Sequence, residues 1–185
     1  MILSDGEIRD ELASGELVID DMKDPELQIQ PSSVDLRLGN EYRHYREDVA
    51  VVDPIRDDHE ALTEKVGPVD EIVLQPDDFI LVPTFERVYI PDDLQGSITG
   101  RSSFGRCGVE VHSTAGLCDP DWEGNIVLEI SNNLKRPINL TPGSRVCQLV
   151  LKRLGRSADV GYAERQDSKY DGQRGPEPSR ALDDP

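Results

Sequence analysis

The sequence predicts a mainly β protein whose antiparallel strands form a barrel or a sandwich, with one short helix near the start. Short runs rich in Val, Ile and Leu recur along the chain, and Pro, Gly or Asn separate them. Several runs alternate apolar with polar residues, as half-buried strands do. The length of 185 residues suits one domain with a sizeable core. Strands spaced in this way are typical of all-β folds.

The helix is predicted from local signals close to the first residue. Ser4 and Glu7 have capping-box spacing, and Ile8 and Leu12 follow at a separation of four residues. We therefore expect a helix over about residues 5–14, ended by the glycine at position 15.

The strands follow the helix in order, beginning with VDLRLG at 34–39. There Val34, Leu36 and Leu38 alternate with two charged residues. The other strands are expected at 78–90, 96–100, 108–113, 125–131, 137–141 and 145–154.

Two stretches of the chain are predicted to lie on the surface. Residues 53–70 are too polar for a core, so they are interpreted as a surface excursion. From Tyr162 onward almost no aliphatic residues occur. We therefore expect one domain over 1–161 and a mobile tail over 162–185, able to order over a ligand.

The net charge of the chain limits the kinds of partner that it can bind. Asp and Glu number 37 against 20 Lys and Arg, which gives a formal net charge of -17. Such self-repulsion is tolerated where salt screens it, so we hypothesise a halophilic protein in a salt-rich cytoplasm, with generic acidity as the alternative. The same acidity argues against a nucleic-acid partner, which needs a basic face.

The compartment is predicted to be a reducing cytoplasm. The acidic start lacks the features of a signal peptide, and no apolar run reaches membrane-spanning length, so no membrane partner is expected. The three cysteines fit neither a disulfide framework nor a Cys-x-x-Cys metal site. They are interpreted as small apolar fillers at Cys107, Cys118 and Cys147.

GRSSFGRCG at 100–108 carries two arginines, two serines and no carboxylate, which is unusual in so acidic a chain. Its glycines permit close backbone approach, and Ser102 and Ser103 are predicted to cap a short helical turn. With Arg101 and Arg106, this turn would bind an anion. An ordinary turn with surface arginines is the alternative.

GLCDPDWEGNIVLEIS at 116–131 reads as a hairpin followed by a strand. The alternation puts Ile126, Leu128 and Ile130 on one face and Val127, Glu129 and Ser131 on the other. Glu129 either faces solvent or lies in a pocket where burial would raise its pKa toward values useful in acid–base catalysis.

Together these motifs resemble the dCTP deaminases, members of the trimeric dUTPase-like superfamily. The resemblance rests on RSSxGRxG, HSTAG, VLE and SKYxGQRGPxxSR, and on QPSSVDLRLG at 30–39. It runs from about residue 1 to residue 180 and is weakest over 53–70.

The resemblance implies a jelly-roll-like antiparallel β barrel and a homotrimer with active sites at subunit interfaces. It implies that Glu129 is catalytic, and that Ser102 and Arg106 position water and offset charge. Further substrate contacts are implied for Arg101, Ser103, Phe104, Gly105, Asp119, Val127, Leu128, Gln148, Tyr162, Lys169 and Gln173. The substrate would be dCTP carrying Mg²⁺ on its phosphates, with dTTP as a possible inhibitor. The H-x-E…P-C-x-x-C signature of zinc deaminases does not occur, so no zinc is expected.

The resemblance also bears on the product. Family members that stop at dUTP carry a bulky His-Arg pair after Thr-Ala, whereas Thr114 and Ala115 are followed by Gly116 and Leu117. A small residue leaves room for a water beside the α-phosphate, which favours hydrolysis of dUTP to dUMP and pyrophosphate in the same site. Gln148 favours the same branch, and Leu117 stands where that branch has an aromatic residue.

Three other functions remain as alternatives: a deaminase that stops at dUTP, a dUTP diphosphatase, and a non-catalytic nucleotide-binding regulatory trimer. GLCDPDWEG resembles the diphosphatase hairpin, but Glu129 on the following strand and the tail GQRGPEPSR speak against that reading. His112 is expected to be a hydrogen-bonded structural histidine, and Trp122 to pack the hairpin tip or a subunit contact.

Overall fold

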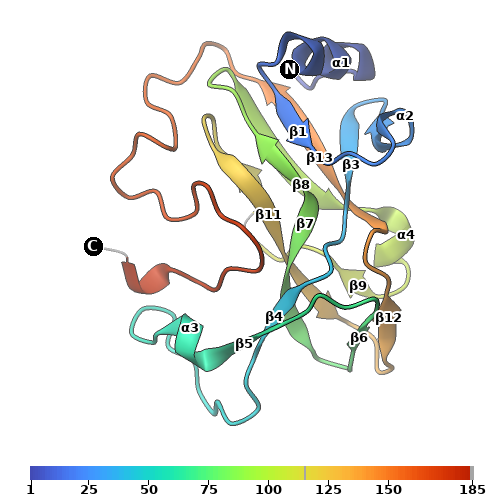
Figure 1. Cartoon of the computed structure of the whole chain (residues 1–185), viewed down its shortest axis with the longest axis vertical. Helices are drawn as coiled ribbons and strands as arrows, with labels where there is room; N and C mark the ends of the chain where they lie inside the picture. The colour runs from blue at the N-terminus through green and yellow to red at the C-terminus, as the bar shows by residue number, and fades with distance from the viewer. Residues whose placement is uncertain (115, 184–185) are drawn as a thin grey trace.

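The computed structural model describes residues 1–114 and 116–183 (Figure 1). Two antiparallel sheets dominate it. The first sheet has the order β5-β4-β7-β11-β9, with β1 also paired to β7, and the second has the order β10-β8-β13-β3-β2. The first comprises β5 (Thr63–Val66), β4 (Tyr42–Tyr45), β7 (Phe79–Tyr89), β11 (Glu123–Asn132), β9 (Val109–Glu110) and β1 (Val18–Asp20). The second comprises β10 (Leu117–Cys118), β8 (Leu94–Gly100), β13 (Arg145–Arg153), β3 (Ser33–Arg37) and β2 (Ile29–Gln30). A small pair joins β12 (Ile138–Leu140) to β6 (Ile72–Leu74).

The expectation of a mainly antiparallel β protein is confirmed, but no closed barrel forms among the described residues. The first sheet ends at β5 and β9, and the second ends at β10 and β2. Three of these edge strands, β2, β9 and β10, are only two residues long. Such short edges offer too few backbone groups for the ladder that closing a barrel needs.

One apolar core lies between the two sheets. Val34, Leu36 and Leu38 reach it from the second sheet, and the alternation predicted for β11 is confirmed because Leu128 and Ile130 are fully buried. Asp35 is buried as well, so β3 is covered on both faces.

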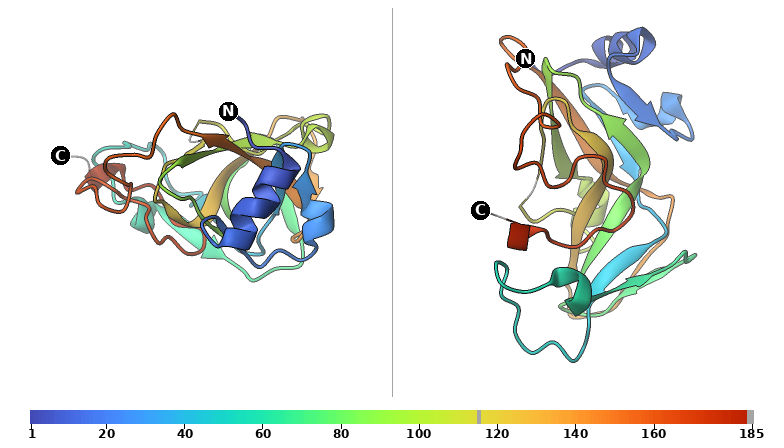
Figure 2. Two further views of the ribbon diagram at one scale, coloured as in Figure 1. Left: turned by 90° about the horizontal axis from the view of Figure 1, so that it is seen from above. Right: turned by 60° about the vertical axis from the view of Figure 1, so that its left-hand side comes forward.

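The predicted helix is α1 (Asp5–Ser14), and both halves of its capping box form between Ser4 and Glu7. Gly15 ends it in the left-handed conformation, at φ 81°. The side chain of Ile8 is fully buried, so the apolar side of α1 covers one end of the sheets. Figure 2 shows α1 at one end of the molecule and the loop before α3 (His59–Leu62) at the other.

Several short elements differ from the sequence prediction. The excursion at 53–70 is mostly exposed, as expected, yet it contains α3 and the edge strand β5. Helix α4 (Ser102–Gly105) is the short helical turn expected there, whereas the arms of the hairpin expected at 116–131 lie in different sheets, β10 paired to β8 and β11 to β7. Strands β1, β2, β4, β5 and β6 and helices α2 (Pro25–Gln28) and η1 (Ala181–Asp183) were not expected. Most of them are too short or too polar to carry an alternating pattern. None of the helices in the described ranges has the length and apolarity that crossing a bilayer requires.

Candidate functional site

A cavity of about 320 Å³ lies where β7, β11 and the C-terminal segment meet. Its walls are largely apolar and aromatic, which suits a flat organic ring. The lining includes Tyr45, Phe79, Leu81, Leu117, Cys118, Asp119, Trp122, Ile126, Val127, Glu129, Tyr162, Tyr170, Gln173, Glu177, Pro178 and Ser179. Six of the residues expected from the sequence therefore meet at one place: Leu117, Asp119, Val127, Glu129, Tyr162 and Gln173.

Glu129 projects from the middle of β11 into this cavity and is half-buried. Its register partner on β7 is Leu81, which also lines the cavity. One carboxylate oxygen, Oε2, accepts a hydrogen bond from the backbone N–H of Thr114 at 3.0 Å and lies 3.5 Å from the Thr114 hydroxyl. The sequence left open whether Glu129 faces solvent or lies in a pocket, and in the structure it lies in the pocket.

The C-terminal segment forms one wall of the cavity. The backbone of Gln173 pairs with that of Asn125, and its side-chain Nε2 donates to the Asn125 carbonyl at 2.8 Å. The indole N–H of Trp122 donates to the Tyr170 carbonyl at 3.0 Å. The Tyr162 hydroxyl accepts from the backbone N–H groups of Lys169 and Tyr170, both at 3.2 Å. Trp122 therefore holds the tail and lines the cavity, and the sequence predicted neither of these two roles.

The GRSSFGRCG segment does not form part of this cavity. None of residues 100–108 lines the cavity, and Figure 1 shows α4 and the C-terminal segment on opposite sides of the molecule. Ser102, Ser103, Gly105 and Arg106 are exposed. Within the described ranges, the side chains of the two serines and Arg106 form no hydrogen bond or ion pair. A single chain therefore leaves these polar groups open toward solvent.

Two details of this segment differ from expectation. The serines do not cap the turn: Arg101 occupies the N-cap without a side-chain cap bond, and the serines form the first turn of α4. A Cβ at Gly100 would lie 2.5 Å from Val111 Cγ2, so the backbone there does approach a neighbour closely. A Cβ at Gly105 would meet nothing within 4 Å, so close packing does not require glycine there.

A buried carboxylate behind this segment was missed by the sequence reasoning. Asp35 is 1% exposed and lies between the guanidinium groups of Arg101, at 3.3 Å, and Arg145, at 3.0 Å. Gln148 donates to Asp35 Oδ1 at 3.2 Å and to Ser33 Oγ at 3.3 Å. No signal in the sequence pointed to this burial, because Asp35 occupies a polar position of the alternating strand at 34–39.

The turn expected to decide the product lies beside Glu129 through Thr114, while Ala115 lies outside the described residues. A Cβ at Gly116 would lie 3.4 Å from both His112 Nε2 and the Ile98 carbonyl oxygen. The prediction for His112 was wrong: both ring nitrogens are buried and have no hydrogen-bond partner among the described residues. The ring lies beside Gly116, near the backbone carbonyl of Ile98, but no described group is placed to bond either nitrogen.

The cysteines differ from one another. Burial, with a smaller contribution from Asp119, raises the pKa of the Cys118 thiol to about 12, so this cavity residue stays protonated at neutral pH. Burial also raises the pKa of Cys147. These two are apolar fillers, as expected, but Cys107 is exposed on the loop after α4, so that interpretation was wrong for it.

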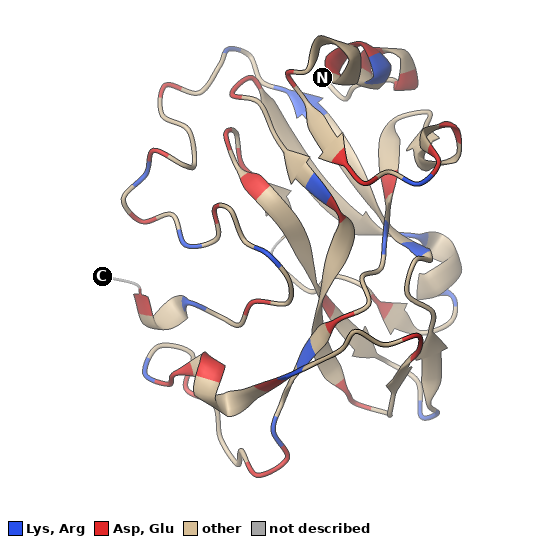
Figure 3. Cartoon of the chain, viewed as in Figure 1, with Lys and Arg blue, Asp and Glu red and all other residues tan. Residues whose placement is uncertain are grey.

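The cavity is suited to a base and a sugar rather than to a chain of phosphates. Its lining includes three carboxylates, Asp119, Glu129 and Glu177, and no Lys or Arg. Figure 3 shows acidic positions spread over helices, strands and loops alike. Cations must therefore come from outside these walls if an anionic nucleotide is to bind.

Comparison with known proteins gives a consistent picture. The family model described as dCTP deaminase-like matches residues 2–154. A protein of Haloarcula marismortui named dCTP deaminase is 46% identical over 191 residues, covering 100% of this chain and 96% of its own. One of Halobacterium salinarum named "dCTP deaminase, dUMP-forming" is 46% identical over 188 residues, with the same coverage. The crystal structure of 2'-deoxycytidine 5'-triphosphate deaminase from Agrobacterium tumefaciens superposes with a TM-score of 0.67 at 29% identity. That match covers 83% of this chain and 46% of the crystallised one.

Proposed function

The chain belongs to the dCTP deaminase-like family, and from this premise we propose that it hydrolyses dCTP to dUTP and ammonia in pyrimidine deoxynucleotide synthesis. The single observation that carries the proposal is Glu129, a half-buried carboxylate in an apolar cavity large enough for a pyrimidine ring. A positioned carboxylate is the kind of group that moves protons in a hydrolysis.

The reaction needs one water and a proton shuttle. The carboxylate of Glu129 takes a proton from water as the oxygen adds to C4 of cytosine, and passes that proton to N3. It then moves the second proton of the added water from its oxygen to the amino group, which leaves as ammonia. The hydrogen bond from Thr114 to Oε2 fixes the rotamer, while Oε1 accepts no hydrogen bond from the described residues. Oε1 is therefore the oxygen assigned to the water.

The active site is assembled from two copies of the chain. The cavity supplies carboxylates and apolar walls, whereas the exposed Ser102, Ser103 and Arg106 supply the donors and charge that the cavity lacks. Packing α4 of one copy against the cavity of the next would put both sets around one nucleotide, in a homotrimer with three such contacts. Ser102 and Arg106 would then position the water and offset charge on the tetrahedral intermediate.

The phosphates arrive with their own countercharge. The substrate is the Mg²⁺ complex of dCTP, because the acidic cavity cannot neutralise the triphosphate. Lys169 and Gln173 lie on the C-terminal segment and are assigned to the phosphates, and Asp119 to the deoxyribose. Deamination should persist in the zinc chelator 1,10-phenanthroline and should require added Mg²⁺. If the chelator abolished ammonia release while Mg²⁺ was present, a mechanism without zinc would be contradicted.

A second step, hydrolysis of dUTP to dUMP and pyrophosphate, is favoured by Gly116. Position 116 itself carries no side chain, in the turn whose Thr114 bonds to Glu129, and a Cβ there would reach ordinary contact distance, 3.4 Å, from His112 and Ile98. The free space is proposed to hold the water that attacks the α-phosphate. Gly116→His should therefore cause dUTP to accumulate, while Gly155→His, the same substitution at an exposed glycine where a Cβ would meet nothing within 4 Å, is the matched control.

Incubation with dCTP and Mg²⁺, followed by chromatography against time, tests the whole proposal. Ammonia with accumulating dUTP means deamination alone, and ammonia with dUMP and no free dUTP means both steps. Turnover of dUTP without any deamination of dCTP would point to a diphosphatase. Binding of dCTP without turnover would point to a regulatory trimer, and either of these results would refute the proposal.

A further inference from the structure

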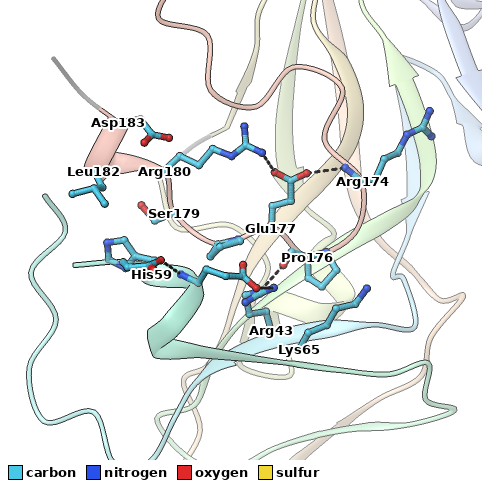
Figure 4. A pocket seen from close by; sticks show the side chains of 13 residues that line it. Arg43, His59, Lys65, Arg174, Pro176, Glu177, Ser179, Arg180, Leu182 and Asp183 are labelled. Atoms are coloured by element: carbon cyan, nitrogen blue, oxygen red, sulfur yellow. Dashed lines mark hydrogen bonds and ion pairs between the residues drawn. The ribbon is translucent and has the colours of Figure 1, made fainter. Parts of the chain in front are cut away.

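Arg43 is a buried arginine on β4 whose guanidinium is held on three sides. Its side chain is 8% exposed. Nε donates to the Pro176 carbonyl at 2.8 Å (Figure 4). Nη1 donates to the Thr63 hydroxyl at 2.9 Å, and Nη2 to Glu60 at 3.0 Å. Three directed bonds from one planar group define a geometry that a lysine cannot reproduce. The cost of burying this charge is offset only while these partners remain.

These three partners come from two segments remote in sequence. Glu60 and Thr63 belong to α3 and β5 in the polar excursion, and Pro176 belongs to the C-terminal segment. Thr63 is itself fixed, because its hydroxyl donates to the His59 carbonyl at 2.6 Å. Arg43 therefore ties the tail to a part of the surface that is otherwise mostly exposed.

The sheet register relates Arg43 to the candidate catalytic residue. Arg43 faces Leu81 across the β4–β7 ladder, and Leu81 faces Glu129 across the β7–β11 ladder. Side chains in one such row project from the same face, and two strand spacings amount to about 10 Å. The face that carries Glu129 therefore continues without interruption to Arg43.

The tail crosses this face and is fixed at both ends of the crossing. Beside β11 it is held by Trp122 and Asn125, and beside β4 by Arg43. Immediately after Pro176, residues 177–179 line both the Glu129 cavity and the neighbouring hollow of about 390 Å³ around Arg43. This short stretch is the wall between the two, and the bond at Pro176 fixes the residue directly before it. Glu177 is held further by the backbone N–H of Arg174 and by the side chain of Arg180.

We propose that Arg43 is a positioning residue that latches the C-terminal segment over the Glu129 cavity, with Thr63 and Glu60 holding the guanidinium from the other side. The inference rests on the proposed function for its kinetic consequence only. Arg43 touches neither the nucleotide nor the reacting atoms. Arg43 sets the fraction of molecules in which residues 177–179 are docked as the cavity wall. It does the same for the segment 169–173, which is assigned to the phosphates.

Trypsin digestion of the ligand-free protein under native conditions tests the latch without any assumption about activity. Cleavage after the exposed Arg174 and Arg180 reports the undocked population of the tail. Arg43→Gln and Arg43→Lys should both raise this cleavage rate by about tenfold, since each loses a buried hydrogen bond from a charged donor. Arg46→Gln is the matched control, because Arg46 lies just past the end of β4 and pairs with the exposed Asp48.

Two further results complete the test. Thr63→Val removes the acceptor for Nη1, together with the hydroxyl's own bond to the His59 carbonyl, but keeps the guanidinium and its other two partners. It should raise cleavage by about two- to threefold, which keeps the inference open to refutation if the Arg43 variants fail to fold. Tail cleavage at the wild-type rate in folded Arg43→Gln, or in Thr63→Val where the Arg43 variants do not fold, would overturn the latch.

The kinetic test is a KM-against-kcat split with dCTP. Arg43→Lys should raise KM by about tenfold with kcat nearly unchanged, because the residue acts on closure and not on the chemistry. A fall in kcat with KM unchanged would mean that Arg43 acts through the sheet on Glu129, and would overturn the inference. If the wild type released no ammonia from dCTP, the proposed function would fail while the cleavage result stood.

Discussion

Glu129→Gln is the substitution that tests the chemistry most directly. The amide has the shape of the carboxylate and keeps an oxygen that can accept the Thr114 N–H now bound to Oε2 at 3.0 Å. The turn and the cavity should therefore persist, and nucleotide affinity with them. What is lost is the ability to take a proton from water.

The expected loss follows from the two proton transfers assigned to this one group. General acid–base catalysis typically contributes about 100- to 10,000-fold, so kcat for ammonia release should fall toward the upper end of this range. That corresponds to about 2.7 to 5.4 kcal/mol of transition-state stabilisation. Ammonia release measured by a coupled assay gives kcat, and calorimetric titration with dCTP gives affinity. Glu64→Gln, an exposed glutamate on the edge strand β5, is the control. Turnover within tenfold of wild type in Glu129→Gln would remove Glu129 from its role.

Three further predictions concern stability and reactivity. Glu86→Ala should lower the free energy of unfolding, measured by urea titration at fixed protein concentration, by about 3 to 5 kcal/mol. The substitution removes a fully buried carboxylate and leaves its partners Arg37 and Gln28 without it. A loss below about 1 kcal/mol would contradict this. Iodoacetamide at pH 8 should label the exposed Cys107 in the native protein and spare Cys118, whose pKa of about 12 keeps the thiol protonated, and rapid labelling of Cys118 by peptide mass spectrometry would be the opposite result. Added KCl should raise the free energy of unfolding because it screens a net charge of -17, and a flat salt titration would count against the salt-rich interpretation.

The sequence was most informative where structure is decided locally. The capping box of Ser4 and Glu7 fixes where α1 begins, since both of its hydrogen bonds lie within one turn. The alternation in β11 predicted which face carries Glu129, because the period of a strand is two. Both patterns can be read without knowing any distant contact.

Features that depend on distant partners could not be read in this way. β4 has the sequence YRHY, and its arginine is buried only because a carbonyl of the C-terminal segment and a hydroxyl of β5 satisfy it. Asp35 reads as the polar half of an alternating strand, yet two arginines from elsewhere cover it. Burial of a charge is a property of such a set of partners, and no spacing along the chain encodes it.

Intersubunit complementation tests the proposed division of the active site between two copies of the chain. A cavity lined by Asp119, Glu129 and Glu177 repels a triphosphate, whereas the exposed Arg106 belongs to a segment none of whose residues lines the cavity of its own chain. If each site takes α4 from one copy and Glu129 from the next, Glu129→Gln and Arg106→Ala should each be inactive alone. Unfolded, mixed in equal amounts and refolded together, they would give random trimers in which about one quarter of the sites combine an intact Arg106 with an intact Glu129. Ammonia release should then recover to about a quarter of the wild-type rate. A mixture no more active than its two components would mean that one chain supplies both groups, and the charge argument for a shared site would fall.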